Sequence, residues 1–481
     1  MISLNLVTLF YLIASVCFIQ ALKGLSHPAT SRLGNGFGMA GMAIAVLTTA
    51  ALIVGLARQD GPGAGIGLGW VLLGLLVGGS VGTLMAKRVE MTKMPELVAF
   101  MHSMIGLAAV AIAVAVVAEP HAFGIAAPGM PIPTGNRLEL FIGTFVGAIT
   151  FSGSVIAFGK LSGKYKFRLF QGAPVTFGGQ HLLNLLLALV MLAGGFWFMA
   201  TQSWTPFVIM TVLAFILGVL IIIPIGGADM PVVVSMLNSY SGWAAAGIGF
   251  SLNNPMLIIA GSLVGSSGAI LSYIMCRAMN RSFFNVILGG FGGQAAAAGA
   301  SGEQVQRPVK SGSPEDAAFL LSNAETVIIV PGYGLAVARA QHALKELTDK
   351  LSAKGITVKY AIHPVAGRMP GHMNVLLAEA EVPYDQVFEM EEINGEFGQT
   401  DVVLVLGAND VVNPAAKNDP ASPIAGMPIL EAYKARNIIV NKRSMAAGYA
   451  GLDNELFYMD RTMMVFGDAK KVVEEMGRAI D

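Results

Sequence analysis

The feature that most constrains the fold of this chain is a series of long apolar stretches that ends near residue 276. Nine of them are long enough to cross a bilayer as helices, which takes about 20 residues each. The run Asn238–Ser241 interrupts the eighth stretch, which is therefore the weakest. We predict a polytopic α-helical membrane domain of about nine spans. The stretches lie near residues 3–22, 36–57, 64–86, 95–118, 138–159, 180–200, 206–224, 231–250 and 255–276.

Composition separates these stretches from the rest of the chain. Only 12% of the 481 residues are charged, against roughly 25% in an average soluble domain. The charge deficit is confined to the residues before about 285. We therefore predict a membrane domain over 1–286, a flexible linker rich in Gly, Ala and Ser over 287–314, and a soluble domain over 315–481. Balanced charge gives no indication of nucleic acid binding, and the two cysteines offer neither metal-ligand spacing nor a disulfide framework.

The basic loops predict how the membrane domain is oriented. Lysines and arginines follow the first, third, fifth and ninth stretches, whereas the opposite loops hold only Arg58 and Arg137. By the positive-inside rule the basic side is cytoplasmic, so the N-terminus lies outside and the C-terminal domain inside, at the inner membrane of a cell. This alternation requires the eighth span. The first stretch lacks a basic leader and a cleavage site, so we expect it to be retained.

Two polar residues lie within the apolar stretches. His102 follows Pro95 by seven residues, and Asn238 follows Pro231 by seven residues. Both helices would enter from the cytoplasm, so both side chains would lie roughly 10 Å along the helix, at similar depth. A histidine and an asparagine at one depth could hold a water chain for a proton, although a satisfied core histidine is the structural alternative. Asp229 precedes the eighth span and could relay protons or only cap the helix.

Glycines recur every four residues in two of the spans. Gly74, Gly78 and Gly82 lie in the third stretch, and Gly261 and Gly265 lie in the ninth. Such rows predict close packing between membrane helices.

The soluble part alternates strand and helix patterns. Helical patterns separate most of the strand candidates, and the chain closes on a predicted helix over Ala469–Ile480. Alternation of this kind predicts an α/β Rossmann-like, doubly wound, mostly parallel sheet. At about 165 residues it is one nucleotide-binding domain, not two. The strand candidates are Thr326–Val330, Thr357–Ile362, Val387–Met390, Asp401–Leu406, Asn437–Asn441, and either Leu456–Met459 or Thr462–Phe466.

The first of these strands leads into a glycine turn, Pro-Gly-Tyr-Gly, and then into a helical pattern from Leu335 onward. This is the context of a dinucleotide fingerprint, in which Gly332 permits the turn and Gly334 lets backbone N–H groups approach a pyrophosphate. Tyr333 lies between them. Val337 stands at the third fingerprint position in place of glycine, so an ordinary strand–turn–helix unit without ligand is the alternative.

A basic cluster indicates which nucleotide binds. An NAD site usually has an acid at the end of the second strand, but here that strand ends in YAIHPVAGR. Lys442, Arg443 and Ser444 follow a later strand instead. Two cations and a hydroxyl suit a 2′-phosphate, to which arginine donates bidentate hydrogen bonds. The sequence therefore favours NADP(H), with a solvated strand end as the alternative.

Two further segments lie where ligands bind in such sheets. Gly407, Asn409 and Asp410 follow the fourth strand candidate; Asp410 could contact the cofactor or titrate near it, and could equally cap an Asx turn. The loop MAAGYAG follows the basic cluster. Small residues around Gly448 and Tyr449 suit a mobile lid, with a plain surface loop as the alternative.

With these residues identified, the chain resembles the β subunits of the proton-translocating NAD(P)+ transhydrogenases. The resemblance spans both the membrane and the soluble parts. It rests on MPELVAFMHS at 94–103, IGGADMPVVVSMLNSYSGW at 225–243, GSSGAILSYIM at 265–275, VPGYGLAVARAQ at 330–341, GRMPGHMNVLLAEAEVPYD at 367–385, GANDVVNPAA at 407–416 and KRSMAAGYAG at 442–451.

The resemblance implies hydride transfer from NADH to NADP+, driven by protons moving inward. It implies that His102, Asn238 and Asp229 match the membrane proton-path residues of the family, and that Asp410 and the Gly448–Tyr449 loop act in coupling and in closing over NADP(H). Val337 fits the family pattern, and Arg368 falls in a matching stretch beside the cofactor.

A partner is required because this chain offers one nucleotide site while hydride transfer needs two. The resemblance implies that NAD(H) binds an α subunit, or separate NAD(H)-binding and membrane chains, in a dimer of heteromers within the lipid bilayer. An NADP(H)-gated transporter or channel without catalysis is an alternative, but no selectivity filter is evident. A quinone-linked dehydrogenase is another, but no flavin, haem or iron–sulfur ligand set is evident.

Overall fold

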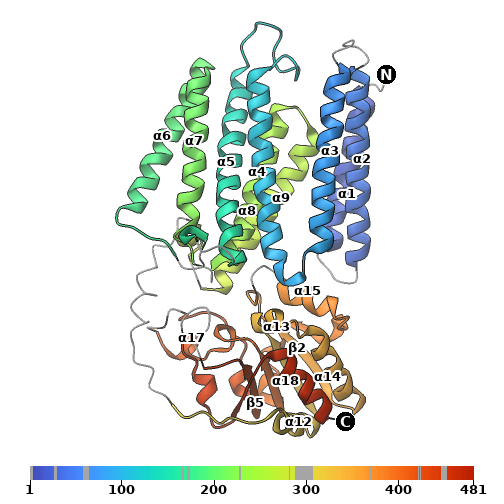
Figure 1. Cartoon of the computed structure of the whole chain (residues 1–481), viewed down its shortest axis with the longest axis vertical. Coiled ribbons are helices and arrows are strands. Elements are labelled where there is room, and N and C mark those ends of the chain that lie inside the picture. The colour runs from blue at the N-terminus through green and yellow to red at the C-terminus, as the bar shows by residue number, and fades with distance from the viewer. Residues whose placement is uncertain are drawn as a thin grey trace. The chain divides into compact units, whose positions relative to one another are not determined.

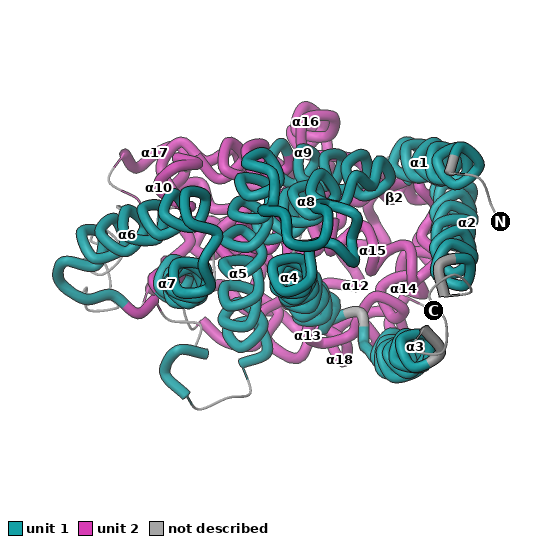
Figure 2. The backbone as a smooth tube through the Cα atoms, turned by 90° about the horizontal axis from the view of Figure 1, so that it is seen from above, with its two compact units in different colours: residues 1–170, 176–223, 236–270 teal, residues 171–175, 224–235, 271–481 magenta. Residues whose placement is uncertain are grey.

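The structure is a computed structural model of the chain (Figure 1). It describes residues 4–25, 30–57, 64–163, 167–170, 174–226, 229–280, 282–287, 307–367, 371–420, 422, 424–445 and 452–480. The chain divides into two compact units, drawn in different colours in Figure 2: residues 1–170, 176–223 and 236–270, and residues 171–175, 224–235 and 271–481. The predicted boundaries at 286 and 314 stay predictions, since most of the predicted linker lies outside the described residues.

Nine long helices in the described residues match the nine predicted apolar stretches. Eight of them are long and apolar enough to cross a membrane. The exception is α8, which carries Asn238, Ser239 and Ser241, so a ninth span stays a prediction. The helices are α1 (Leu4–Leu25), α2 (Ser31–Ala57), α3 (Ala64–Arg88), α4 (Met94–Ala118), α5 (Thr134–Ser162), α6 (Gln180–Thr201), α7 (Trp204–Ile222), α8 (Met230–Ser251) and α9 (Pro255–Ala278), followed by the short α10 (Phe283–Ile287).

Glycines bring several of these helices into backbone contact. A Cβ atom added at Gly106 of α4 would lie 2.6 Å from the carbonyl oxygen of Gly147 in α5. One added at Gly242 of α8 would lie 2.3 Å from the amide nitrogen of Gly265 in α9. Such approaches exclude any side chain. The packing role predicted for Gly261 and Gly265 is therefore confirmed.

The glycine row of α3 behaves differently. Helices α1, α2 and α3 stand side by side (Figures 1 and 2). Cβ atoms added at Gly74, Gly78 and Gly82 would meet no described atom within 4 Å. The prediction that this row packs against another helix is wrong for contacts within the described part of this chain.

The second unit contains a six-stranded parallel sheet in the order β3-β2-β1-β4-β5-β6. Consecutive residues of β1 and β4 are buried, so both faces of the central strands are covered. The predicted parallel sheet is confirmed, and 462–466 is the sixth strand. The strands are β1 (Thr326–Pro331), β2 (Thr357–Ile362), β3 (Val387–Glu389), β4 (Val402–Leu406), β5 (Asn437–Lys442) and β6 (Thr462–Phe466).

Short helices connect the strands. One difference from the prediction lies after β1, where the expected single helix ends at Ala338 and restarts at Gln341. Arg339 adopts the left-handed conformation with φ 51°, and the N–H of Ala340 donates to the carbonyl of Leu335 to close the first helix. The helices are α12 (Pro314–Ser322), α13 (Tyr333–Ala338), α14 (Gln341–Ala353), α15 (His372–Glu379), α16 (Met390–Ile393), α17 (Ala415–Asn418) and α18 (Ala469–Ala479).

The end of the predicted linker is part of this unit. The N–H of Gly312 donates to the carbonyl of Met464 at 2.9 Å, and the N–H of Met464 donates to the carbonyl of Lys310 at 2.8 Å. Ser313 then caps α12 by accepting a hydrogen bond from the N–H of Asp316. Residues 310–313 therefore extend the edge of the sheet beside β6.

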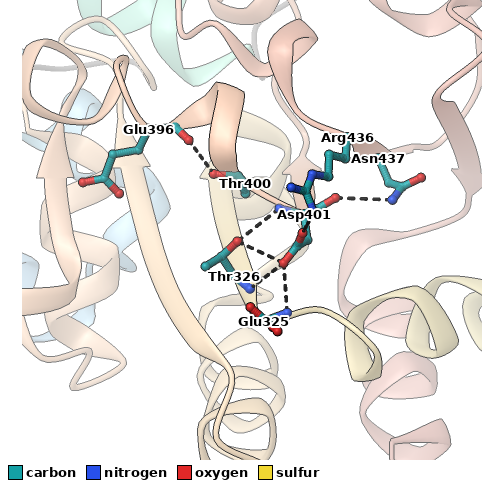
Figure 3. Close-up of polar contacts among 7 residues, drawn as sticks. All are labelled: Glu325, Thr326, Glu396, Thr400, Asp401, Arg436 and Asn437. Carbon is teal, nitrogen blue, oxygen red and sulfur yellow. Dashed lines mark hydrogen bonds and ion pairs between the residues drawn. The ribbon is translucent and has the colours of Figure 1, made fainter.

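The amino ends of β1, β4 and β5 are joined by one carboxylate (Figure 3). Asp401 accepts hydrogen bonds from the N–H groups of Glu325 and Thr326, at 3.0 and 3.1 Å, and from the Thr326 hydroxyl. The guanidinium of Arg436 donates to it at 2.8 Å. Burial acts to raise the pKa of Asp401, but these hydrogen bonds and the arginine outweigh it and lower the pKa. Both carboxylate oxygens have partners.

Candidate functional site

The carboxyl edge between β1 and β4 is the topological switch point of the sheet. These strands are neighbours although β2 and β3 lie between them in the chain, and ligands of open α/β sheets bind at such a crevice. The N–H of Gly332 donates to the carbonyl of Leu406 at 2.8 Å, and the N–H of Gly334 donates to the carbonyl of Gly407 at 2.9 Å. The turns after the two strands are therefore fixed to each other.

Three glycines make this contact possible. Gly407 has φ +66°, and a Cβ atom on it would lie 2.3 Å from the Cα atom of Gly334. A Cβ atom on Gly332 would lie 2.4 Å from the carbonyl oxygen of Gly407. Backbone packing between the turns is thus a sufficient reason for glycine at all three positions. The N–H of Gly334 has a partner within the protein, and the cofactor contacts predicted for these glycines stay predictions.

Two other predicted residues lie in α13, next to this turn. The ring of Tyr333 lies 6.2 Å from the ring of His372 in α15. The side chain of Val337 is 45% exposed. Neither position contradicts a cofactor contact.

Asn409 and Asp410 follow β4 at the same edge. Asp410 is the first residue of the 3-10 helix η7 (Asp410–Val412). Burial raises the pKa of Asp410 to about 6, against the opposing effect of Lys442. Its Oδ1 is buried and has no hydrogen-bond partner among the described residues, and the same holds for Nδ2 of Asn409. We call these two buried atoms without described partners the orphaned atoms of the switch point.

The basic residues after β5 have different surroundings. The ammonium of Lys442 lies 4.6 Å from the ring centre of Phe457, and burial lowers its pKa while Asp410 opposes that shift. Arg443 forms an ion pair with Asp468 at 2.9 Å, and its side chain is 63% exposed. Lys442 therefore belongs to the Asp410 cluster, whereas Arg443 lies at the surface beside α18. Ser444 follows directly, and the predicted 2′-phosphate role of all three residues stays a prediction.

Sequence reasoning missed two buried asparagines that hold η7. Asn454 donates from Nδ2 to the carbonyl of Asn409 at 3.0 Å, and Asn413 donates from Nδ2 to the carbonyl of Asp453 at 2.9 Å. Both side chains are fully buried. Their partners lie 45 and 40 residues away in the chain, so no local sequence pattern could reveal them. Arg368, Gly448 and Tyr449 lie outside the described residues.

The first compact unit, which holds the long apolar helices and is called the membrane unit below, contains a second polar site. Nε2 of His102 in α4 lies 3.1 Å from Oδ1 of Asn238 in α8, so the predicted pair is in contact. With Oδ1 of Asn238 as the acceptor, Nε2 is the donor of this hydrogen bond, which corresponds to the Nε2–H form of the imidazole. Nδ1 is buried and has no hydrogen-bond partner among the described residues. Asp229 precedes α8, where its N–H donates to the carbonyl of Gly226.

Comparison with known proteins decides the family. The family model described as NAD(P) transhydrogenase beta subunit matches residues 7–479. The chain belongs to the NAD(P) transhydrogenase beta subunit family. Two relatives called NAD(P) transhydrogenase subunit beta, from Rhodospirillum rubrum and from one strain of that species, are each 58% identical over 471 residues. The alignment covers 98% of this chain and 98% of each relative.

This membership confirms the predicted family and the predicted enzyme class. A transhydrogenase beta subunit with eight helices capable of crossing a membrane is a multi-pass membrane protein. A beta subunit also implies an alpha subunit as its partner, and a transhydrogenase implies the use of NAD(H) and NADP(H).

Proposed function

We propose that this transhydrogenase beta subunit binds NADP(H) at the carboxyl edge of β1, β4 and β5 and exchanges a hydride with NAD(H) bound to the alpha subunit. The reaction from NADH to NADP+ is coupled to inward proton translocation through the membrane unit. The subunits act as a dimer of heteromers in a cell inner membrane, with the N-terminus outside and the sheet domain in the cytoplasm, as the basic loops indicate.

The orphaned atoms at the switch point carry this proposal. Native proteins rarely leave buried polar groups without partners, and each exception calls for a ligand, an ion or water. Here a buried amide donor on Asn409 and a buried carboxylate oxygen on Asp410 lack partners among the described residues, and the cation of Lys442 acts on Asp410. A polar, anionic dinucleotide fits this set. When bound, NADP(H) supplies the nicotinamide that accepts or gives the hydride.

Each residue of the site has a role that follows from its chemistry. Lys442, Arg443 and Ser444 would hold the 2′-phosphate, with bidentate hydrogen bonds from arginine. Asp410 has a pKa of about 6, so it can hold or release a proton close to physiological pH. Ionisation of Asp410 is favoured by Lys442 and opposed by burial, so any change in that balance shifts its proton occupancy.

In the membrane unit, the imidazole of His102 would accept and release the translocated proton. The bond to Asn238 holds Nε2 in its protonated form and leaves Nδ1 as the acceptor. A buried imidazole nitrogen without a partner among the described residues is suited to take a proton from a water molecule. Asp229, ahead of α8, would relay protons between this site and the cytoplasm.

The proposal is tested by proton uptake into sealed vesicles that contain this chain and its alpha subunit. Uptake should accompany NADH-dependent reduction of an NADP+ analogue, and this chain alone should not transfer hydride. His102→Ala should abolish uptake while NADPH binding persists. His121→Ala, which alters an exposed histidine outside the helices, is the control and should pump normally. Normal uptake by His102→Ala vesicles would exclude His102 from the proton path, and transhydrogenation by this chain alone would reveal a second nucleotide site.

A further inference from the structure

Asn454 is a fully buried residue that contacts the switch point from a distant part of the chain. It precedes the 3-10 helix η9 (Glu455–Tyr458). Its Nδ2 donates to the backbone carbonyl of Asn409 at 3.0 Å and to Oδ1 of the same residue at 3.2 Å. Its Oδ1 accepts a hydrogen bond from the N–H of Leu456 at 2.9 Å. Both polar atoms of the Asn454 carboxamide therefore have partners.

These contacts determine which way two carboxamides face. If Asn454 turned over, its oxygen would meet the carbonyl oxygen of Asn409 and its nitrogen would meet the N–H of Leu456. One acceptor would then face another acceptor, and one donor would face another donor, so neither pair could form a hydrogen bond. Backbone groups thus fix Asn454, and the Nδ2 group of Asn454 in turn requires an acceptor from the Asn409 side chain. Oδ1 of Asn409 occupies that place, so Nδ2 of Asn409 is directed elsewhere.

We propose that Asn454 is a positioning residue that holds Asn409 with its amide donor turned toward an acceptor oxygen of the bound dinucleotide. The proposal rests on the function proposed above. It explains why Nδ2 of Asn409 is buried without a hydrogen-bond partner among the described residues, which is costly unless a ligand supplies the acceptor. Asn454 itself touches no ligand, because its own polar atoms are already used.

Asn413 provides a matched control at the other end of η7. It is also fully buried, and its Nδ2 donates to the carbonyl of Asp453, the residue before Asn454. Its Oδ1 accepts a hydrogen bond from the N–H of Ala415 at 3.0 Å. Asn413→Asp therefore removes the same kind of donor from the same pair of segments, without changing the contacts of Asn409.

The test is NADPH binding to the full chain in detergent, measured by NADPH fluorescence. In Asn454→Asp the introduced carboxylate cannot donate, so the Asn409 amide turns over to donate to it and presents an oxygen to the ligand. We expect binding to weaken about 10- to 100-fold, the effect of one unpaired buried group. Asn413→Asp should stay within about two-fold. Protection of the β4 amides from hydrogen exchange should fall similarly in both variants, so a difference in NADPH affinity between them reports lost positioning and not lost stability.

A double variant further separates lost positioning of Asn409 from lost stability as the cause of weaker binding. In an Asn409→Ala background the amide donor is already absent, so adding Asn454→Asp should weaken NADPH binding no further. Additive effects, or equal weakening by Asn454→Asp and Asn413→Asp, would overturn the positioning role. If Asn454→Asp does not fold, Asn454→Ala replaces it in both comparisons with the same expected non-additivity. Failure of the unmodified chain to bind NADPH would overturn the proposed function, whereas unchanged affinity in Asn454→Asp overturns only this inference.

Discussion

Asp401 directly precedes strand β4 and Asp410 follows it at the start of η7, and the pKa values of the two carboxylates shift in opposite directions. At the amino end, Asp401 accepts hydrogen bonds from two backbone amides, a hydroxyl and a guanidinium, and its pKa is lowered. At the carboxyl end, Asp410 is buried with one oxygen that has no partner among the described residues, and its pKa is raised to about 6. Aspartate thus stabilises the fold at the amino edge of the sheet, whereas at the carboxyl edge the burial of an aspartate reduces stability.

The difference shows how structural and functional polar residues can be distinguished. A network that is satisfied within the protein stabilises the strands that it joins and gains nothing from a ligand. A buried group without a partner reduces stability, and a chain tolerates it where binding or chemistry requires it. The amino edge is therefore predicted to tolerate mutation at a cost in stability alone. Substitution of the buried polar groups without described partners at the carboxyl edge should show the reverse, because in the proposed function these groups serve the ligand.

The largest expected effect comes from filling the space between the turns at the carboxyl edge. Gly407→Ala would place a Cβ atom 2.3 Å from the Cα atom of Gly334, at a left-handed φ of +66°. Neither backbone can move without breaking the bond between the two turns. We expect the free energy of unfolding to fall by about 4 kcal/mol or more, the sum of steric overlap and left-handed strain. Hydrogen exchange of the amides in β1 and β4 measures it.

Gly355 is the matched control at the amino edge, in the turn before β2. It also has a left-handed φ, +85°, but a Cβ atom there would meet nothing within 4 Å. Gly355→Ala should cost only about 1 kcal/mol, from the backbone conformation alone. Equal losses in the two variants would mean that the contact between the turns contributes nothing.

Much of the fold follows from the sequence, because burial of strands and spans leaves a local pattern. Apolar strand patterns predicted five of the six strands and left two alternatives for the sixth, of which Thr462–Phe466 is the strand; apolar length predicted all nine long helices. The position of Asp410 after a strand also placed it at the carboxyl edge of the sheet. The sequence does not distinguish Asp410 from Asp401, because the partners that satisfy Asp401 include Thr326, 75 residues away. Whether a polar group is satisfied is a property of long-range contacts.

The same limit applies to helix ends and to helix surfaces. Arg339 ends a helix in a conformation that usually requires glycine or asparagine, so the break after Ala338 leaves no signal. The glycine rows of α3 and α9 have the same spacing, yet among the described residues the row of α9 contacts another helix and the row of α3 meets no atom within 4 Å. Spacing indicates that a helix can pack closely, and the tertiary structure decides whether it does.

The second largest effect is expected at the amino edge. Asp401→Ala removes the acceptor of the Glu325 and Thr326 amides and should lower the free energy of unfolding by about 3 kcal/mol. NADPH affinity and transhydrogenation per folded molecule should stay unchanged, because the proposed NADP(H) site lies at the opposite edge of the sheet. Arg436→Ala removes only an ion pair whose arginine is 70% exposed, so it should cost at most about 1 kcal/mol. Loss of NADPH affinity in Asp401→Ala would contradict the division between the two edges.

The smallest of these effects is expected for Asp410→Asn, which should raise the free energy of unfolding where the other substitutions lower it. Burial raises the pKa of Asp410 from 3.8 to about 6, so the folded state binds this proton more tightly than the unfolded state does. The resulting stability is fully present below about pH 4 and is lost as pH rises through 6. Asp410→Asn removes the ionisation and should therefore raise the free energy of unfolding at pH 8, by about 2 kcal/mol after allowance for partial exposure. At pH 4 the two proteins should be nearly equal in stability.

Hydrogen exchange of the amides in β4, corrected for intrinsic exchange rates at each pH, would measure the difference in the free energy of unfolding between Asp410→Asn and the unmodified protein. Transhydrogenation should fall in Asp410→Asn although the protein is more stable, because the variant cannot exchange a proton at this position. Asp401→Asn is the matched substitution at the other end of the strand, and there a loss of stability at pH 8 is expected with activity retained. A stability gain in Asp410→Asn that did not vary with pH would show that the carboxylate is not ionising against its surroundings. If Asp410→Asn instead lost stability at pH 8, the carboxylate would be satisfied in the folded protein, and the contrast between the two aspartates of β4 would fail.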